Sequence, residues 1–247
     1  MRLGYETIPV GTPHARHPIS PTMRATVTTI LSYGGLQSET SSRLTFPSLS
    51  NYRLVTVHGF RRVFAHPHFF LCGVGICNPQ INSQAASLSV EPCKDASFVA
   101  AAFDVEMDTV ERAAFEEREI EYRIATAVFH PLGSSSDAAP EGKGLLCVAN
   151  TDDALSTAMR GEEWVRNLPS GYGIWNWPTD SGLLPASVYL RHCLIAVKKA
   201  GDVAERSFRE ETLLCDRRTT LASYLADYEA EVMAALPPPE LAVRFGG

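Results

Sequence analysis

The sequence lacks any apolar run that approaches the roughly 20 residues needed to span a bilayer, and its N-terminus lacks a compact hydrophobic signal core. It also lacks paired C-x-x-C spacing, so its six cysteines do not match a zinc motif. Free and mostly buried thiols in a reducing compartment are therefore expected, which makes a cytoplasmic protein the prediction. Three disulfides in a secreted chain remain the alternative.

The common catalytic motifs are absent too. No Lys-Ser or Lys-Thr pair follows a glycine turn at the spacing of a phosphate-binding loop, and the chain has neither a G-x-S-x-G elbow nor an H-E-x-x-H helix. His66 and His68 flank a proline without a clear third ligand, which favours a structural pair over a metal site. We expect no metal and no cofactor.

Charge is distributed unevenly along the chain. The 247 residues carry a net charge of −6, which disfavours nonspecific nucleic-acid binding. Residues 1–92 nevertheless contain seven arginines, no lysine and only three acidic residues. Either these arginines are structural, or they give an anionic substrate mildly positive surroundings. We expect neither nucleic acid nor a membrane as a partner, and no pattern indicates an oligomeric state.

Strand-like segments come first along the chain, and helical segments come last. Strands are predicted at residues 25–31, 52–66, 69–77, 84–91, 98–105, 119–130 and 144–149. Helices are predicted at residues 107–117, 152–167, 185–199, 203–214 and 220–235, before three prolines at 237–239 that are expected to end the ordered structure. This order is typical of an α+β fold.

We divide the chain into three parts on the same grounds. Residues 1–24 form an N-terminal tail, predicted to be disordered, with a weak organelle-targeting segment as the alternative. Residues 25–150 form a strand-rich domain, and residues 151–247 form a helical C-terminal extension that packs on it.

Two glycines follow the first predicted strand. Gly34 and Gly35 stand in the segment SYGGL at residues 32–36, directly after the apolar run at 25–31. Glycine permits backbone angles that a Cβ forbids and lets a ligand approach the main chain, so such a turn can aim several N–H groups at one anion. A plain tight turn is the simpler interpretation.

Four glutamates cluster at a predicted helix-to-strand junction, in the segment FEEREIEYR at residues 115–123. A solvated helix end explains most of them. A single carboxylate that turns inward against apolar walls would have its pKa raised toward neutrality, because burial disfavours its ionised form. A general acid or base needs this property at physiological pH.

Together, three short segments resemble the γ-glutamyl cyclotransferase family, including its AIG2-like members. Residues 33–36 (YGGL) resemble the family's Tyr-Gly-Ser-Leu turn. Residues 57–64 (VHGFRRVF) resemble its x-Gly-Tyr-Arg-Arg-x-Phe strand, and residues 115–119 (FEERE) resemble its Leu-Asp-x-x-Glu element. The resemblance covers about residues 25–132, while the tail beyond residue 150 is only loosely similar to plant- or alga-type extended members.

The resemblance implies a compact mixed β-barrel flanked by helices, with the glycine turn and a glutamate lining one cavity. It implies a small γ-glutamyl substrate, held through main-chain N–H groups by Tyr33, Gly34, Gly35 and Leu36. Glu119, the last residue of the third segment, would be the acid/base. The implied reaction converts a γ-glutamyl amine or peptide to 5-oxoproline and a free amine or amino acid, without a cofactor.

This sequence departs from the family at two positions near the implied site. Gly35 stands where the family usually has serine, and Ile120 stands where a glycine often follows the catalytic glutamate. A non-catalytic member, with the same fold used as a ligand-binding or interaction module, is therefore the alternative function. Separately, the aromatic segment YGIWNWP at 172–178 is either a partner-docking surface or a lid packed between the barrel and the C-terminal helices.

Overall fold

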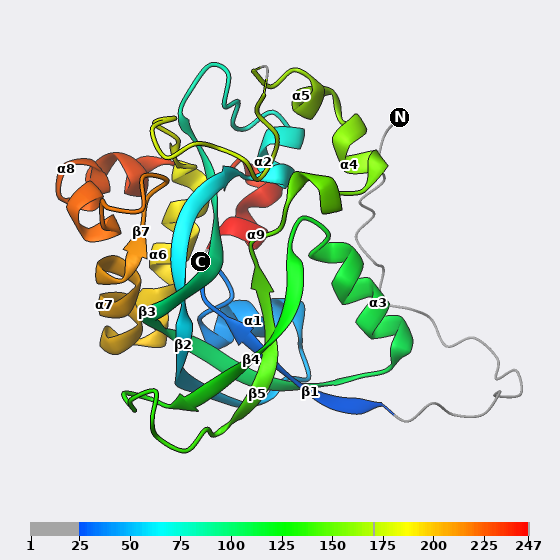
Figure 1. Cartoon of the computed structure of the whole chain (residues 1–247), viewed down its shortest axis with the longest axis vertical. Coiled ribbons are helices and arrows are strands. Elements are labelled where there is room, and N and C mark those ends of the chain that lie inside the picture. Colours follow the sequence, from blue (N-terminus) through cyan, green and yellow to red (C-terminus); the bar gives the residue numbers. More distant parts are fainter. Residues whose placement is uncertain (1–24, 170, 247) are drawn as a thin grey trace, which may run out of the picture.

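The computed structural model describes residues 25–169 and 171–246 (Figure 1), so the expected tail at 1–24 lies outside the described residues. Within them, seven strands form one sheet in the order β6-β3-β1-β5-β4-β2-β7. The strands are β1 (Thr26–Ser32), β2 (Ser50–Pro67), β3 (Gln84–Met107), β4 (Arg123–Pro131), β5 (Gly142–Val148), β6 (Leu184–Pro185) and β7 (Thr212–Leu213). Among the described helices, none meets the length and hydropathy that crossing a bilayer requires.

The sheet closes into a barrel because β2 pairs with β3 as well as with β4. The closed ring runs through β3, β1, β5, β4 and β2 and returns to β3. β1 and β5 pair in parallel, with Ile30 beside Leu145, whereas the other pairings of the ring are antiparallel. The predicted α+β fold with a mixed barrel is confirmed.

The two longest strands frame the barrel, and they are continuous where the sequence suggested a break. We predicted separate strands at 84–91 and 98–105, but β3 runs from Gln84 to Met107 alongside β2. The pairing shifts register opposite Gly59, whose φ of 82° is one that residues with a Cβ rarely adopt. The residues between the two predicted strands therefore form a bulge within one strand rather than a loop.

Helices cover the barrel on its outer side (Figure 1). They are α1 (Glu39–Thr45), α2 (Phe69–Gly73), α3 (Thr109–Arg118), α4 (Thr157–Gly161), α5 (Glu163–Arg166), α6 (Ser187–Ala200), α7 (Asp202–Glu210), α8 (Leu221–Ala234) and α9 (Ala242–Phe245), with 3₁₀ turns η1 (Asp152–Ala154) and η2 (Pro239–Leu241). The long helix predicted at 152–167 is divided among η1, α4 and α5.

Two other predictions about these segments are wrong. The apolar run at 69–77 is not a strand but helix α2 followed by a turn, because a short apolar run does not distinguish the two by its periodicity. The prolines at 237–239 do not end the ordered structure. Pro239 begins η2, where the missing proline N–H is not needed, and α9 follows.

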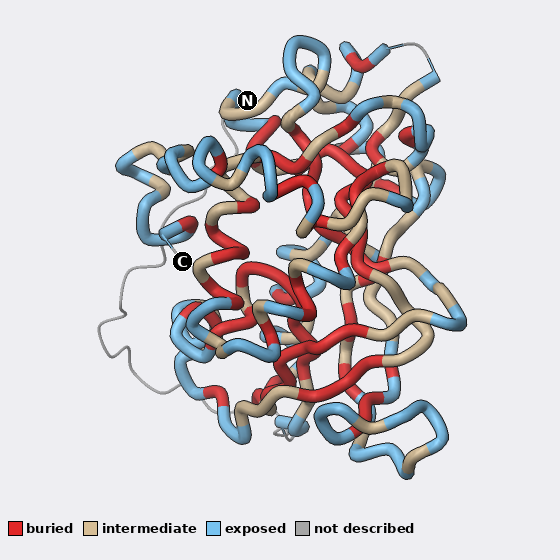
Figure 2. The backbone as a smooth tube through the Cα atoms, turned by 90° about the vertical axis from the view of Figure 1, so that its left-hand side faces the viewer, coloured by how far each residue is buried: buried red, intermediate tan, exposed pale blue. Residues whose placement is uncertain are grey.

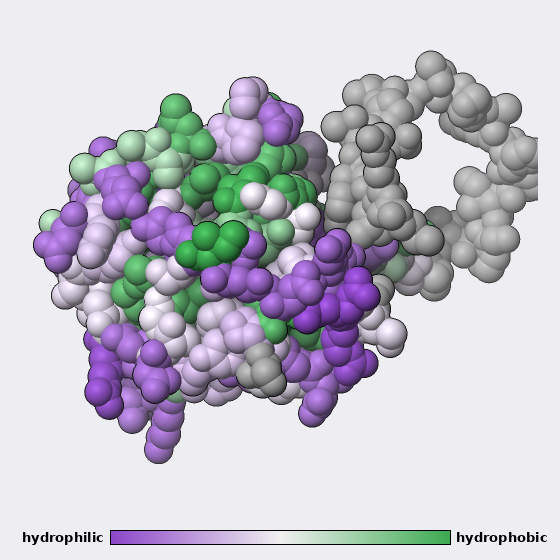
Figure 3. All heavy atoms as spheres, turned by 90° about the horizontal axis from the view of Figure 1, so that it is seen from above, coloured by the Kyte–Doolittle hydropathy of each residue, from purple (hydrophilic) through white to green (hydrophobic). Residues whose placement is uncertain are grey.

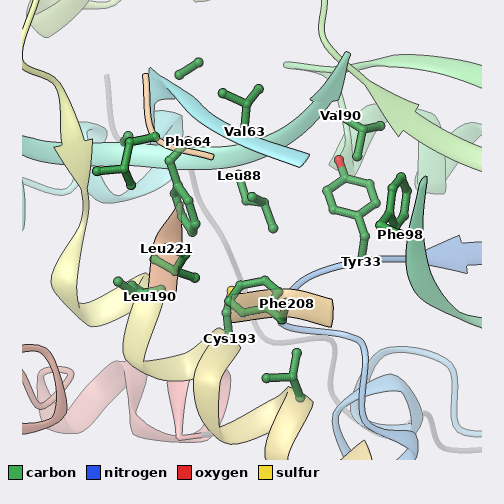
Figure 4. Close-up of a cluster of buried hydrophobic side chains, with 14 of the residues drawn as sticks. Tyr33, Val63, Phe64, Leu88, Val90, Phe98, Leu190, Cys193, Phe208 and Leu221 are labelled. Carbon is green, nitrogen blue, oxygen red and sulfur yellow. The ribbon is translucent and has the colours of Figure 1, made fainter. Parts of the chain in front are cut away.

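One hydrophobic core runs through the barrel and the C-terminal helices. Leu88 and Phe98 of β3 belong to the same buried cluster as Leu190 of α6 and Phe208 of α7. Figure 4 shows these side chains in one group, with Tyr33 beside Phe98. Figure 2 shows the buried stretches running together through the middle of the molecule. The core therefore crosses residue 150, and the proposed boundaries at 24 and 150 stay predictions.

A buried arginine fastens α7 to the barrel. Arg62 of β2 is 0% exposed, and its guanidinium carbon lies 5.2 Å from the ring centroids of both Phe98 and Phe208. Its Nη2 donates a 2.8 Å hydrogen bond to Ser207 Oγ, and a carboxylate oxygen of Glu211 lies 3.8 Å from it. Burial lowers the pKa of Arg62 to about 9, so the side chain stays a cation at neutral pH. The charged side chain of Arg62 on β2 therefore contacts both β3 and α7.

We predict that Arg62→Ala lowers the free energy of unfolding by about 3 to 5 kcal/mol, because it leaves a cavity between Phe98 and Phe208 and removes the hydrogen-bond partner of buried Ser207. Arg61→Ala is the matched control. Arg61 is the next residue, its side chain is 30% exposed, and it pairs with Glu91 at 2.5 Å, an arrangement worth about 1 kcal/mol or less. Urea unfolding of both variants measures the difference, and equal losses would contradict the role given to Arg62.

Candidate active site

β1 carries Tyr33 into the barrel interior. The side chain is 7% exposed, its ring lies edge-on to Phe98 at a centroid distance of 6.1 Å, and its hydroxyl donates a 2.6 Å hydrogen bond to the Cys147 carbonyl oxygen. This bond can form because β1 and β5 are parallel neighbours. The chain then turns, and the Gln37 N–H donates to the Gly34 carbonyl oxygen at 2.9 Å. The predicted tight turn is present.

Helix α6 covers this glycine turn. A Cβ on Gly35 would lie 2.3 Å from His192 Nε2, and a Cβ on Gly34 would lie 3.1 Å from the Tyr189 hydroxyl. The Gly35 N–H donates to the Cys193 sulfur. The glycines are therefore required here because a helix packs directly on their backbone. One of the N–H groups expected to bind substrate already has a protein partner.

The departure from serine at position 35 has a physical explanation. The place that a serine Cβ would take is filled by the His192 ring, which is 8% exposed and comes from a helix far along the chain. Leu36, the last residue of the predicted binding segment, is half-buried, and its carbonyl oxygen accepts a hydrogen bond of 2.5 Å from Ser42. The four predicted binding residues thus lie together, under α6.

Glu119 lies where α3 ends and the chain turns toward β4. Its N–H donates to the Phe115 carbonyl oxygen at 3.0 Å, and its side chain is 19% exposed. The Cys147 thiol donates a hydrogen bond to its carboxylate, and Arg118 Nε lies 3.3 Å from Oε1. Burial raises the pKa of the Glu119 carboxyl above its ordinary value, although Arg118 and Arg244 oppose the change.

Cys147 connects the two predicted parts of the site. Its carbonyl oxygen accepts the Tyr33 hydrogen bond, and its thiol donates to Glu119. Burial raises the pKa of Tyr33, and the neighbouring ionisable groups of Cys147 and Glu119 raise it further. Glu119 is therefore close to the residue that begins the glycine turn. Its role in proton transfer, and the role of the turn in binding, stay predictions.

A second carboxylate, which we did not single out from the sequence, lies beside the first. Glu121 Oε2 accepts a 3.3 Å hydrogen bond from the Phe69 N–H at the start of α2. Burial and the neighbouring charge of Glu119 raise the pKa of Glu121 to about 8. The next residue, Tyr122, donates to the Leu88 carbonyl oxygen at 3.0 Å. The sequence signal for Glu121 was its position two residues after Glu119, in the same helix-to-strand junction.

The histidines at the end of β2 and the aromatic segment pack together. The His66 ring stacks on Trp175 at 3.9 Å, and the His68 ring meets Tyr189 edge-on at 4.7 Å. Burial lowers the pKa of both histidines, so both are neutral at physiological pH. Trp177 is 7% exposed and donates to the Gly173 carbonyl oxygen at 2.7 Å. These contacts match the packing interpretation of both segments.

Two surface hollows among the described residues lie away from the candidate site, because neither is lined by Glu119 or by the glycine turn. One is lined by Glu39, Thr40, Arg43 and Leu44, and the other by Asp152, Leu155, Arg160, Val165, Gly171, Tyr172, Gly173 and Asn176. Among the described residues, no three histidine, cysteine or acidic side chains converge so that they could hold a metal ion.

Comparisons with known proteins give similarities at the level of overall shape. No family model matches the sequence, and no curated protein matches it. A solved γ-glutamyl cyclotransferase is 8% identical over 87% of this chain and 90% of that chain, with a TM-score of 0.44. An uncharacterized human protein is 10% identical over 51% and 68%, with a TM-score of 0.38. A protein from Arabidopsis thaliana is 15% identical over 55% and 76%, with a TM-score of 0.33. Similarity of this degree does not assign the chain to a family.

We predict that Gly35→Ser lowers the free energy of unfolding by about 1 to 3 kcal/mol, because the new side chain overlaps the His192 ring. In the double variant with His192→Ala, the loss is smaller than the sum of the two single losses, since the serine takes vacated space. Gly161→Ser is the control, because a Cβ there meets open space. Urea unfolding tests the cycle, and additive losses would contradict the contact.

We predict that Glu121 makes the protein less stable as pH rises. Its folded pKa of about 8 lies above the ordinary value of 4.5. Between these values the folded state keeps a proton that the unfolded state releases, so rising pH favours unfolding, by on the order of a few kcal/mol. Glu121→Gln should lack this loss. Urea unfolding at about pH 5 and pH 8 compares it with wild type and with exposed Glu117→Gln, which should keep the wild-type slope.

Proposed function

We propose that this chain is a γ-glutamyl cyclotransferase-like enzyme, an acyltransferase acting within one molecule. It converts a γ-glutamyl amine or peptide, glutathione among the compatible substrates, to 5-oxoproline and a free amine or amino acid. One observation carries the proposal: the Glu119 carboxyl has a pKa raised by burial and meets, through Cys147, the residue that begins the glycine turn. The ordered resemblance of residues 33–36, 57–64 and 115–119 supports the same reaction.

The reaction needs few protein groups because the substrate carries its own nucleophile. The α-amine of a γ-glutamyl compound attacks the γ-carbonyl carbon of the same molecule, a C–N bond of the ring forms, and the original amide C–N bond breaks. Holding the substrate folded makes this attack intramolecular, which can contribute roughly 7 to 11 kcal/mol. The protein supplies a fold that orients the substrate and a group that moves one proton.

Glu119 would move that proton. As a carboxylate it takes a proton from the α-ammonium group, and as a carboxylic acid it returns the proton to the leaving amine. Burial raises this pKa toward neutral pH, the direction that favours a group which both takes and returns a proton. The adjacent Glu121 accepts the Phe69 N–H, and its pKa of about 8 keeps it mostly protonated near neutral pH, so the proposed proton transfer is assigned to Glu119.

Substrate binding at the glycine turn requires a local rearrangement. The His192 ring lies against Gly35, and the Gly35 N–H is bonded to the Cys193 sulfur. The ring would have to rotate away before the N–H groups of residues 33–36 could meet a substrate carboxylate or a developing oxyanion. In the proposed enzyme, the His192 ring therefore closes the glycine turn until it moves.

The same contact favours the alternative function. If the His192 ring stays on Gly35, the fold serves as a non-catalytic ligand-binding or interaction module, with the glycine turn acting only as a packing surface for α6. The two functions differ in one measurable outcome, because only the enzyme releases 5-oxoproline.

We predict that Glu119→Gln lowers 5-oxoproline formation by about 10²- to 10⁴-fold, because the amide neither accepts nor returns the proton. The assay uses a panel of glutathione, γ-glutamyl amino acids and γ-glutamyl-lysine. Glu117→Gln, an exposed neighbour on α3, is the control and should keep wild-type activity. For wild type, kcat/KM should rise with pH up to the raised pKa of Glu119.

The outcomes separate the possibilities. No product from any panel member with the wild-type chain would favour the non-catalytic module. Product formed equally well by wild type and Glu119→Gln would leave the reaction in place but remove Glu119 from it.

A further inference from the structure

Two cysteines meet at the end of α2. The sulfur atoms of Cys72 and Cys77 lie 2.9 Å apart, with Cys72 5% exposed and Cys77 half-buried. A disulfide bond is about 2.05 Å long, so the two sulfur atoms need to approach by only about 0.9 Å from their 2.9 Å separation. The six cysteines are free thiols here, and this pair is held in contact by the fold.

A helix-ending turn holds the two sulfurs together. α2 ends at Gly73, and Gly75 follows with a φ of 77°. The Gly75 N–H donates to the Cys72 carbonyl oxygen at 3.1 Å, and the Ile76 N–H donates to the Leu71 carbonyl oxygen at 2.9 Å. This is the Schellman pattern, in which a left-handed glycine reverses the chain after a helix. The reversal returns residue 77 to the side of residue 72.

We propose that Cys72 and Cys77 form a reversible intrachain disulfide by exchange with a low-molecular-weight disulfide. Cys77 is the more accessible sulfur, so its thiolate attacks first, breaks the small disulfide and releases one small thiol. Cys72 then gives up its proton and attacks the Cys77 sulfur, which releases the second small thiol. Overall, two protein thiols are oxidised to one disulfide, and one small disulfide is reduced to two thiols.

The second step depends on pH. In the free pair, the hydrogen bond between the two thiols and burial both raise the pKa of Cys72. Burial remains once Cys77 carries the small thiol, so the Cys72 thiolate is scarce at neutral pH. Among the described residues, Glu121 is an ionisable group near this thiol, and it also raises the pKa of Cys72. Closure of the disulfide should therefore become faster as pH rises, while a preformed disulfide persists.

The position of this pair gives the disulfide a structural consequence. The first residue of α2, Phe69, donates its N–H to Glu121, and the next, Phe70, lies under the Arg244 guanidinium at 4.0 Å from ring centroid to Cζ. A bond between Cys72 and Cys77 would fix the end of the same short helix. Figure 3 views the end of the molecule that carries α2, where hydrophobic residues reach the surface among hydrophilic ones. The disulfide itself does not depend on the proposed reaction.

The test is a redox titration of the full-length chain. The folded protein is equilibrated in glutathione buffers from reducing to oxidising, quenched with acid, alkylated and digested for mass spectrometry. We expect Cys72 and Cys77 to lose alkylation together, with a linked peptide lighter by two hydrogen atoms, and dithiothreitol to reverse the change. Cys93, Cys147, Cys193 and Cys215 should stay alkylated at the same midpoint.

Two comparisons make the result decisive. In the urea-unfolded chain the equilibrium constant for this disulfide should be at least about ten-fold smaller, because the fold no longer supplies the effective concentration. Cys77→Ser should leave Cys72 alkylated at every buffer composition, and Cys93→Ser should leave the pair unchanged. Continued alkylation of both cysteines under oxidising buffers, a lasting glutathione adduct on Cys77, or equal constants in the folded and unfolded chains would each overturn the proposal.

Discussion

The buried guanidinium of Arg62 is the contact on which the arrangement of the site depends. A cation with no exposed surface is tolerated only where other groups replace water, and here two aromatic faces, Ser207 and the Glu211 carboxylate do so. These groups fix α7 against β2 and β3. α7 follows α6 through Gly201 and packs on it, so the position of α6 over the glycine turn is fixed as well. Through these contacts, Arg62 of β2 fixes helix α6 in its position against Gly35.

The candidate site is a group of polar side chains enclosed by apolar ones. Tyr33, Cys147 and Glu119 form a connected series, and Glu121 adjoins it. Burial raises the pKa of the phenol and of both carboxyls, and neighbouring ionisable groups raise the pKa of Tyr33 and of Glu121 further. The arrangement combines the proton-transfer group of an enzyme with the tight packing of a structural core. Substrate binding requires access to the glycine turn, whereas the packed His192 ring covers that turn.

Local sequence patterns predicted much of the barrel and the long C-terminal helices α6, α7 and α8 that cover it, but not the short elements between them. The alternation at 52–66 predicted β2, and Asp108 predicted the start of α3, where it forms a capping box with Glu111. Residues 69–77 and the bulge in β3 were not predicted, because their conformations follow from a reversing glycine and from the long partner strand. Glu119 and Tyr33–Leu36 were found through the resemblance. Their neighbours Cys147 and His192 come from distant segments, and no local pattern marks a contact of that kind.

The ring of strands also sets the order in which the molecule can be completed. β1 is the first described strand, yet its partners are residues 101–107 and 145–146. Until they emerge during synthesis, the nascent chain carries Ile30 and Leu31 on an open strand edge, a template for unwanted association. The hydrogen-bond partner of Arg62 is synthesised later still, because Ser207 lies 145 residues further along the chain. Maturation therefore depends on pairings between remote segments, which makes folding slow and leaves the growing polypeptide in need of protection while it is being made.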